Sequence, residues 1–248
     1  MIDIHCHILP GVDDGSQDME TSLEMIAAAY DSGVRSMIAT PHCYPGLYEN
    51  YASRPLQQAW NELYHAVHAA GIPMHLYQGM EIMAFDDLVS YLEDGRLWTL
   101  NGTSYCLVEF DFREDPAYCK RILASCLSAG YQPIIAHPAR YFFVQDHPSL
   151  VYEWYQMGCG IQINKDSLLR RHGQMAYEIS HSLLRHHLVS CVASDAHETA
   201  MRTTDLDEVR EYLINEYNEE YAYMLLEENP SRILEGKSLV GYAPRAYK

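Results

Sequence analysis

Histidine and carboxylate side chains recur in this sequence directly after short apolar runs, and both are common ligands of divalent metal ions. A lone histidine in such a place is more often only hydrogen-bonded, but recurrence at the same end of successive runs favours a shared function. A histidine or carboxylate residue stands at the end of six of the seven apolar runs. The residues are His5 and His7, His42, Glu81, Glu109, His137, and Asp195 with His197, and Asp14 follows in a turn beyond His7. The remaining run ends in Asn164 and Lys165, which are not a convincing ligand pair.

The spacing and the ligand types narrow the kind of metal site. His5-x-His7 and Asp195-x-His197 each place two side chains on one side of an extended chain. Imidazole and carboxylate without thiolate suit zinc, manganese or iron. Nine candidate ligands exceed what one ion takes, so we expect two or three ions.

The elements that must position these residues follow from the alternation of apolar runs and amphipathic segments. Such alternation predicts β-α-β units and a parallel sheet, and about seven units in this length favour a barrel related to the TIM architecture. The runs cover residues 2–4, 34–40, 74–80, 105–109, 132–136, 160–163 and 189–194, and the helical segments cover 19–31, 55–70, 86–93, 117–129, 148–157, 166–187 and 205–227. In such a barrel the carboxyl ends of all strands share one face. An open doubly wound sheet is the alternative, but its glycine fingerprint is missing because Ile163 stands where the third glycine is required.

Several motifs resemble one known superfamily over essentially the whole chain. The run from His5 to Gly15 is similar to the opening motif of the PHP (polymerase and histidinol phosphatase) superfamily, and in particular to that of the bacterial tyrosine-protein phosphatases of capsular and exopolysaccharide clusters. The further matching segments are residues 39–42, 79–81, 108–110, 136–141 and 194–197.

This resemblance implies a distorted (β/α)7 barrel, the PHP fold, with a cluster of three ions that are commonly manganese. By analogy one ion is held by His5, His7, Glu81 and Asp195, a second by Glu81, Glu109 and His137, and a third by Asp14, His42 and His197. Arg140 and Arg202 fall where the family has phosphate-binding arginines, and Thr203 and Thr204 follow Arg202 in place of the family's proline-containing turn.

The expected reaction is hydrolysis of a phosphomonoester by a metal-bound hydroxide. The resemblance implies phosphotyrosine in a protein as the substrate. The resemblance implies a polysaccharide-export tyrosine kinase as the partner. The general acid stays open between His42 and a metal-bound water. No cysteine is followed six residues later by arginine, so the C-x5-R loop of the cysteine-dependent phosphatases is absent. A small-molecule phosphatase of the same superfamily, such as one for histidinol phosphate, and a non-enzymatic scaffold are the alternatives. Amidohydrolases commonly carry a modified lysine where this chain has Glu109.

Charge supports a metal-assisted site for an anionic substrate. The chain of 248 residues has a formal net charge of −17, which argues against nucleic-acid binding. Asp14, Glu81, Glu109 and Asp195 would repel phosphate by themselves, whereas three divalent ions reverse the local sign.

Composition predicts one domain over residues 1–248 with a short basic tail at about 237–248. No apolar stretch reaches the 18 residues of a membrane span, and the N-terminal residues do not resemble a secretory signal. The seven cysteines form no C-x-x-C pair and lie mostly in apolar runs, so we expect buried free thiols and a cytoplasmic location.

Overall fold

The computed structural model describes residues 1–247, and in it the apolar runs pair side by side as parallel strands. The strands are β1 (Ile2–Cys6), β2 (Ser36–Ala39), β3 (His42–Cys43), β4 (His75–Gln78), β5 (Glu81–Met83), β6 (Tyr105–Glu109), β7 (Gln132–Ile135), β8 (Gly160–Asn164) and β9 (Cys191–Ala193). Most of their residues are buried, because helices cover the outer face of the sheet and side chains fill the inner face.

The strands form two hydrogen-bonded groups that together make one curled sheet. The first group has the strand order β1-β2-β4 and the second has the order β3-β5-β6-β7-β8-β9. Two-residue breaks separate β2 from β3 and β4 from β5, and the Glu81 amide donates to the Pro41 carbonyl (3.1 Å) across these breaks. Beyond β9, the Asp195 amide donates to the His5 carbonyl and the His7 amide to the Ala196 carbonyl, both at 2.8 Å. The last strand therefore returns to the first, and the predicted α/β class with a parallel sheet is confirmed.

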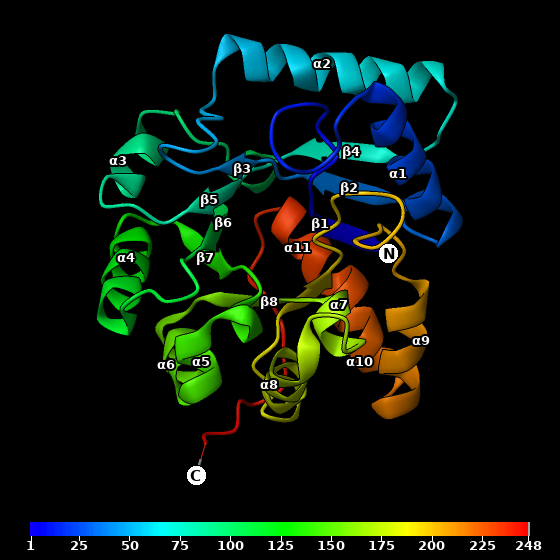
Figure 1. Ribbon diagram of the computed structural model, residues 1–248. Coiled ribbons are helices and arrows are strands. Elements are labelled where there is room, and N and C mark those ends of the chain that lie inside the picture. Colours follow the sequence, from blue (N-terminus) through cyan, green and yellow to red (C-terminus); the bar gives the residue numbers. More distant parts are fainter. Residues whose placement is uncertain (248) are drawn as a thin grey trace.

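Helices surround the curled sheet (Figure 1). They are α1 (Met19–Asp31), α2 (Arg54–Ala69), α3 (Leu88–Glu93), α4 (Pro116–Ser128), α5 (Phe142–Asp146), α6 (Ser149–Met157), α7 (Lys165–Leu168), α8 (Gly173–Arg185), α9 (Asp207–Glu216), α10 (Glu219–Tyr223) and α11 (Asn229–Leu234), with short turns η1 (Leu100–Gly102), η2 (Pro138–Arg140) and the π-helical η3 (Met224–Glu228). None of these helices is both long and apolar enough to cross a bilayer.

Two apolar clusters fix the strands. The larger lies mainly between the sheet and the outer helices. The smaller fills the inside of the curl with residues such as Ile4, Ile38 and Leu107, and Ile233 of α11 joins it. All seven cysteines are free and buried, as expected from their apolar surroundings.

Two predicted helices are interrupted. The predicted helix at 166–187 is divided into α7 and α8, because Arg170 and Gly173 both have positive φ (64° and 86°). The predicted helix at 205–227 ends its first part at Glu216, where Tyr217 leaves helical geometry (φ −123°, ψ −88°).

The predicted basic tail is bound to the body of the protein over its described part. Residues 237–247 contain no helix or strand, but Asn229 and Val240 exchange two hydrogen bonds of 2.8 Å. The ring of Tyr247 stacks on His186, with centroids 3.9 Å apart. Lys248 lies outside the described residues.

Candidate metal centre

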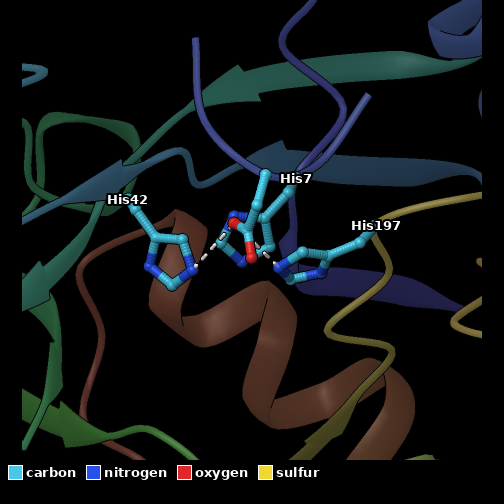
Figure 2. A group of neighbouring side chains, drawn as sticks. His7, His42 and His197 are labelled. Atoms are coloured by element: carbon cyan, nitrogen blue, oxygen red, sulfur yellow. Dashed lines mark ion pairs between the residues drawn. The ribbon is translucent and has the colours of Figure 1, made fainter. Parts of the chain in front are cut away.

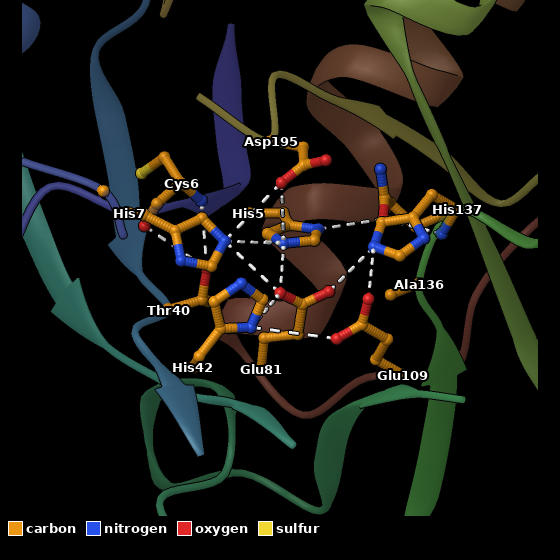
Figure 3. Close-up of polar contacts among 12 residues, drawn as sticks. His5, Cys6, His7, Thr40, His42, Glu81, Glu109, Ala136, His137 and Asp195 are labelled. Carbon is orange, nitrogen blue, oxygen red and sulfur yellow. Dashed lines mark hydrogen bonds and ion pairs between the residues drawn. The ribbon is translucent and has the colours of Figure 1, made fainter. Parts of the chain in front are cut away.

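The nine predicted ligands converge at the carboxyl end of the sheet. Figure 3 shows His5, His7, His42, Glu81, Glu109, His137 and Asp195 among them. Their places in the strands differ slightly from the prediction. His5 lies within β1, His42 and Glu81 begin β3 and β5, and Glu109 is the last residue of β6. The other residues follow strands, as expected.

The first group consists of His5, His7, Glu81 and Asp195, one ligand atom of each lying within 4.8 Å of the others. The Nε2 atoms of the two histidines face each other at 3.2 Å. Glu81 Oε2 lies 3.2 and 3.3 Å from them, and Asp195 Oδ1 lies 3.5 Å from each. Two nitrogens bound to one ion at about 2.1 Å are themselves roughly 3.0–3.4 Å apart. The observed separations therefore fit a shared cation.

The second group combines His7 and His42 with Asp14 and His197 (Figure 2). Asp14 Oδ1 lies 3.4 Å from His42 Nε2 and 3.5 Å from His197 Nε2. The side chain of Asp14 is half exposed, so this group faces the opening of the site. The resemblance implied this set without His7.

The third group is His42, Glu81 and Glu109. His42 Nδ1 lies 3.0 Å from Glu81 Oε2 and 3.7 Å from Glu109 Oε2. The resemblance implied His137 with these two carboxylates. His137 Nε2 lies 2.9 Å from Glu81 Oε1 and 3.6 Å from Glu109 Oε1, so both histidines flank the glutamate pair.

Two buried atoms of the cluster test whether cations fit it. Three imidazole nitrogens, from His5, His7 and His42, lie within 3.3 Å of Glu81 Oε2, yet none of the described residues forms a hydrogen bond with that oxygen. His197 Nε2 likewise has no hydrogen-bond partner within residues 1–247. Buried polar atoms are almost always paired, so an unpaired carboxylate oxygen and an unpaired imidazole nitrogen in one cluster suit coordination to cations. The donor set fits divalent ions.

The electrostatics of the cluster point the same way. Burial, together with the Glu81 and Asp195 carboxylates, raises the pKa of Glu109 well above its usual range. Burial alone would lower the pKa of His5, but Glu81 and Asp195 outweigh it and raise that pKa. Protons thus balance part of the negative charge here, and cations would replace them.

Asp13 holds two candidate ligands in place through hydrogen bonds, although its sequence pattern indicated only a turn. Its Oδ2 accepts hydrogen bonds from His7 Nδ1 (2.9 Å) and from the His42 amide (2.8 Å). The first bond fixes the tautomer of His7 that leaves Nε2 free for a metal. Gly15 completes the turn because a Cβ there would lie 2.3 Å from the His7 carbonyl oxygen. In the sequence, the Asp13-Asp14-Gly15 turn shortly after His7 was the feature that could have indicated this role.

The sixth predicted strand, now β8, contributes two amides in place of ligands. Gln162 Oε1 accepts from His5 Nδ1 (3.0 Å) and from the His137 amide (3.2 Å). Its Nε2 donates to Asn164 Oδ1 (2.8 Å), and Asn164 Nδ2 donates to Asp195 Oδ2 (2.5 Å). These fully buried amides orient three candidate ligands. Sequence reasoning missed this role because amides are not typical ligands.

The two predicted phosphate-binding arginines contact different oxygens of one carboxylate, that of Asp195. Arg140 Nη1 is 3.2 Å from Asp195 Oδ2, and Arg202 Nη2 is 2.9 Å from Asp195 Oδ1. Both guanidinium groups are partly exposed at the rim of the cluster. His137 and Asp195 have left-handed backbones (φ 34° and 52°), a strained geometry that is frequent at functional sites.

Comparisons with known proteins identify the family of this chain. The profile of the family described as capsular polysaccharide synthesis, CpsB/CapC, matches residues 1–235. The tyrosine-protein phosphatase YwqE of Bacillus subtilis (strain 168) is 36% identical over 248 residues, which cover 100% of this chain and 97% of the relative. The tyrosine-protein phosphatase CpsB of Streptococcus agalactiae serotype V is 30% identical over 242 residues, covering 94% and 98%.

Solved structures show the same likeness. A chain from the crystal structures of YwqE from Bacillus subtilis and CpsB from Streptococcus pneumoniae, described as unique metal-dependent tyrosine phosphatases, gives a TM-score of 0.93 over 100% of both chains at 36% identity. A lactonase from Listeria monocytogenes, 11% identical with a TM-score of 0.59 over 94% of each chain, shares the fold alone. This chain therefore belongs to the CpsB/CapC family of capsular polysaccharide synthesis.

Proposed function

We propose that this protein is a metal-dependent phosphomonoester hydrolase that removes phosphate from phosphotyrosine in a protein. One observation carries the proposal: a buried cluster of imidazoles and carboxylates meets two arginines, Arg140 and Arg202, at its rim. Such a cluster suits cations and the arginines suit a phosphate dianion. The relatives named tyrosine-protein phosphatase, at 30–36% identity over nearly the whole chain, support it.

The residues that would hold the ions are those of the three groups, with His137 beside the glutamate pair. Manganese is our first choice for the native metal, and iron and zinc are the alternatives that the same ligands allow. When bound, the ions would supply Lewis acidity and a water of lowered pKa.

The side chains of the chain itself have separate tasks. Arg140 and Arg202 would bind and orient the phosphate, as forked donors that match its oxygens. Asp195 holds both guanidinium groups close to the cluster through its two oxygens. His42 faces candidate ligands with both ring nitrogens, so we assign it to metal binding in preference to the role of general acid.

We further propose that the curled sheet is a (β/α)7 barrel formed by residues 1–248 as one domain. Counting β2 with β3 and β4 with β5 as single interrupted strands gives seven segments, and the return of β9 to β1 supports closure. A cytoplasmic location and a polysaccharide-export tyrosine kinase as the substrate protein complete the proposal. The seven free thiols support the cytoplasmic location, and membership of the CpsB/CapC family supports the kinase as the substrate protein.

The test is a direct comparison of substrates and of metal content. The purified protein should contain two or three divalent ions by elemental analysis and should dephosphorylate a phosphotyrosine peptide far faster than histidinol phosphate. The double variant His5→Ala/His7→Ala should lose metal and activity while its far-UV circular dichroism stays unchanged. His75→Ala, at the exposed opposite end of β4, is the matched control. Faster hydrolysis of histidinol phosphate would favour the small-molecule alternative, and activity without metal would contradict the proposal.

A further inference from the structure

A pocket of about 340 Å³ opens directly beside the candidate metal centre. Three of the residues that line it, Asp14, His42 and Glu109, are candidate ligands (Figure 3 shows the last two). Apart from Asp111, its other walls are aromatic or apolar: Tyr44, Leu47, Tyr48, Met83, Phe110 and Phe112. The pocket therefore combines charged and apolar walls beside the candidate ligands.

One wall is the turn from Tyr44 to Tyr48, which follows β3. The amide of each of these tyrosines donates to the carbonyl of the other, at 2.7 and 2.8 Å, and Gly46 takes the left-handed conformation that closes the turn (φ 84°). The side chain of Leu47 is 62% exposed at the tip. The Tyr48 ring lies nearly parallel to His42, with an interplanar angle of 10° and centroids 5.7 Å apart.

Asn50 fixes this wall to the metal centre. Its Nδ2 donates to the Val12 carbonyl (2.8 Å), next to Asp13 and Asp14, and to the His42 carbonyl (2.9 Å). The turn is thus tied to two segments that carry candidate ligands, and its apolar side chains keep a defined position relative to the cluster.

The second wall is Phe112, three residues after Glu109. The guanidinium carbon of Arg140 lies 4.9 Å from the Phe112 ring centroid, and the His137 ring meets the same phenyl ring edge-on at 6.5 Å. One arginine therefore reaches both the proposed phosphate position and the apolar wall. A ligand that combines a phosphate with an adjacent ring matches this arrangement.

We propose that Leu47, Tyr48 and Phe112 form an aryl slot that holds the ring of the substrate and sets the preference for phosphotyrosine over alkyl phosphomonoesters. The inference rests on the proposed function and adds its specificity-determining residues. In an aryl phosphate a single oxygen separates the ring from the phosphorus, so a phosphate at the metal centre places the ring in the adjoining pocket. Phosphoserine has only a methylene group at this place and would leave the apolar walls in contact with water.

The kinetic test uses Leu47→Ala and Tyr48→Leu in the manganese-loaded full-length protein. For a phosphotyrosine peptide we expect kcat/KM to fall by about tenfold in each variant, mainly through KM, because apolar and aromatic contacts to the ring are lost. Inhibition by inorganic phosphate should stay within about twofold of the unsubstituted protein, as should activity on a phosphoserine peptide. Tyr223→Leu, an exposed tyrosine on α10, is the matched control. Equal losses on the phosphotyrosine and phosphoserine peptides would overturn the slot.

A binding test separates failure of the slot from failure of the proposed function. Phenylphosphonate and methylphosphonate, which are not phosphate esters, are titrated into the manganese-loaded protein by calorimetry. We expect the phenyl compound to bind more tightly and Leu47→Ala to reduce that preference by about tenfold. If the protein hydrolyses no aryl phosphate but shows this preference, the proposed function fails and the slot stands. If the two phosphonates bind equally, the slot fails whatever the activity.

Discussion

Replacing Asp13 by asparagine should weaken metal binding without removing any candidate ligand. The carboxylate accepts three hydrogen bonds, from His7 Nδ1 (2.9 Å), the His42 amide (2.8 Å) and the Gly15 amide (2.9 Å). A carboxamide has one oxygen, so in either orientation its NH₂ group faces at least one of these donors. The substitution also removes the negative charge that strengthens the bond to His7.

The expected size follows from these contacts. A hydrogen bond to a charged group contributes about 1.5–3 kcal/mol, against about 0.5–1.5 kcal/mol for a neutral one. In Asp13→Asn, the hydrogen bond from His7 changes from a charged to a neutral one, and one hydrogen bond from a backbone amide is lost. Together these changes cost about 1.5–3 kcal/mol. At about 1.4 kcal/mol for each tenfold change, metal affinity should fall roughly 10- to 100-fold. This range matches what changes of a metal-orienting carboxylate typically cost.

Competition of Mn²⁺ between the protein and a fluorescent chelator measures this affinity directly. Asp18→Asn is the matched control, because Asp18 caps α1 in the same loop, contacts Thr21 and touches no candidate ligand. Asparagine caps helices as well as aspartate does, so the control should bind metal normally. An unchanged affinity in Asp13→Asn would refute the claim that Asp13 orients His7. Equal loss in both variants would show a general disturbance of the loop.

Three other predictions can be tested on the same protein. Chelation should abolish phosphatase activity and Mn²⁺ should restore it; activity that survives complete metal removal would contradict the mechanism. Metal binding should release protons, because neighbouring carboxylates raise the pKa of His5 and burial raises the pKa of Glu109. Metal affinity should therefore fall as the pH is lowered. Calorimetry in buffers of different ionisation enthalpy detects the released protons, and binding heats that do not depend on the buffer would argue against the prediction. Arg140→Ala should weaken inhibition by inorganic phosphate by about tenfold or more, whereas Arg54→Ala on α2 should not; equal inhibition constants would remove Arg140 from the site.

The sequence by itself predicted the α/β class with its parallel sheet and which side chains would lie together at the candidate metal centre. Alternating apolar runs and amphipathic segments require parallel strands with helices outside, and the carboxyl ends of such strands share one face. This is why His5, Glu81 and Asp195, which lie far apart in the chain, could be assigned to one cluster before any coordinates. The strand periodicity of two also placed His5 and His7 together and Cys6 on the other side, where its thiol donates to the Ile38 carbonyl.

Only the tertiary structure decided how these residues divide into groups and what holds them. The place of His42 between Asp14 and Glu81, and of His137 beside both glutamates, depends on strand register and on the left-handed backbone at His137. The support from Gln162 likewise comes from a neighbouring strand. Local patterns report on residue type and periodicity, whereas distances between side chains arise from packing among distant segments, and no short stretch of sequence contains that information.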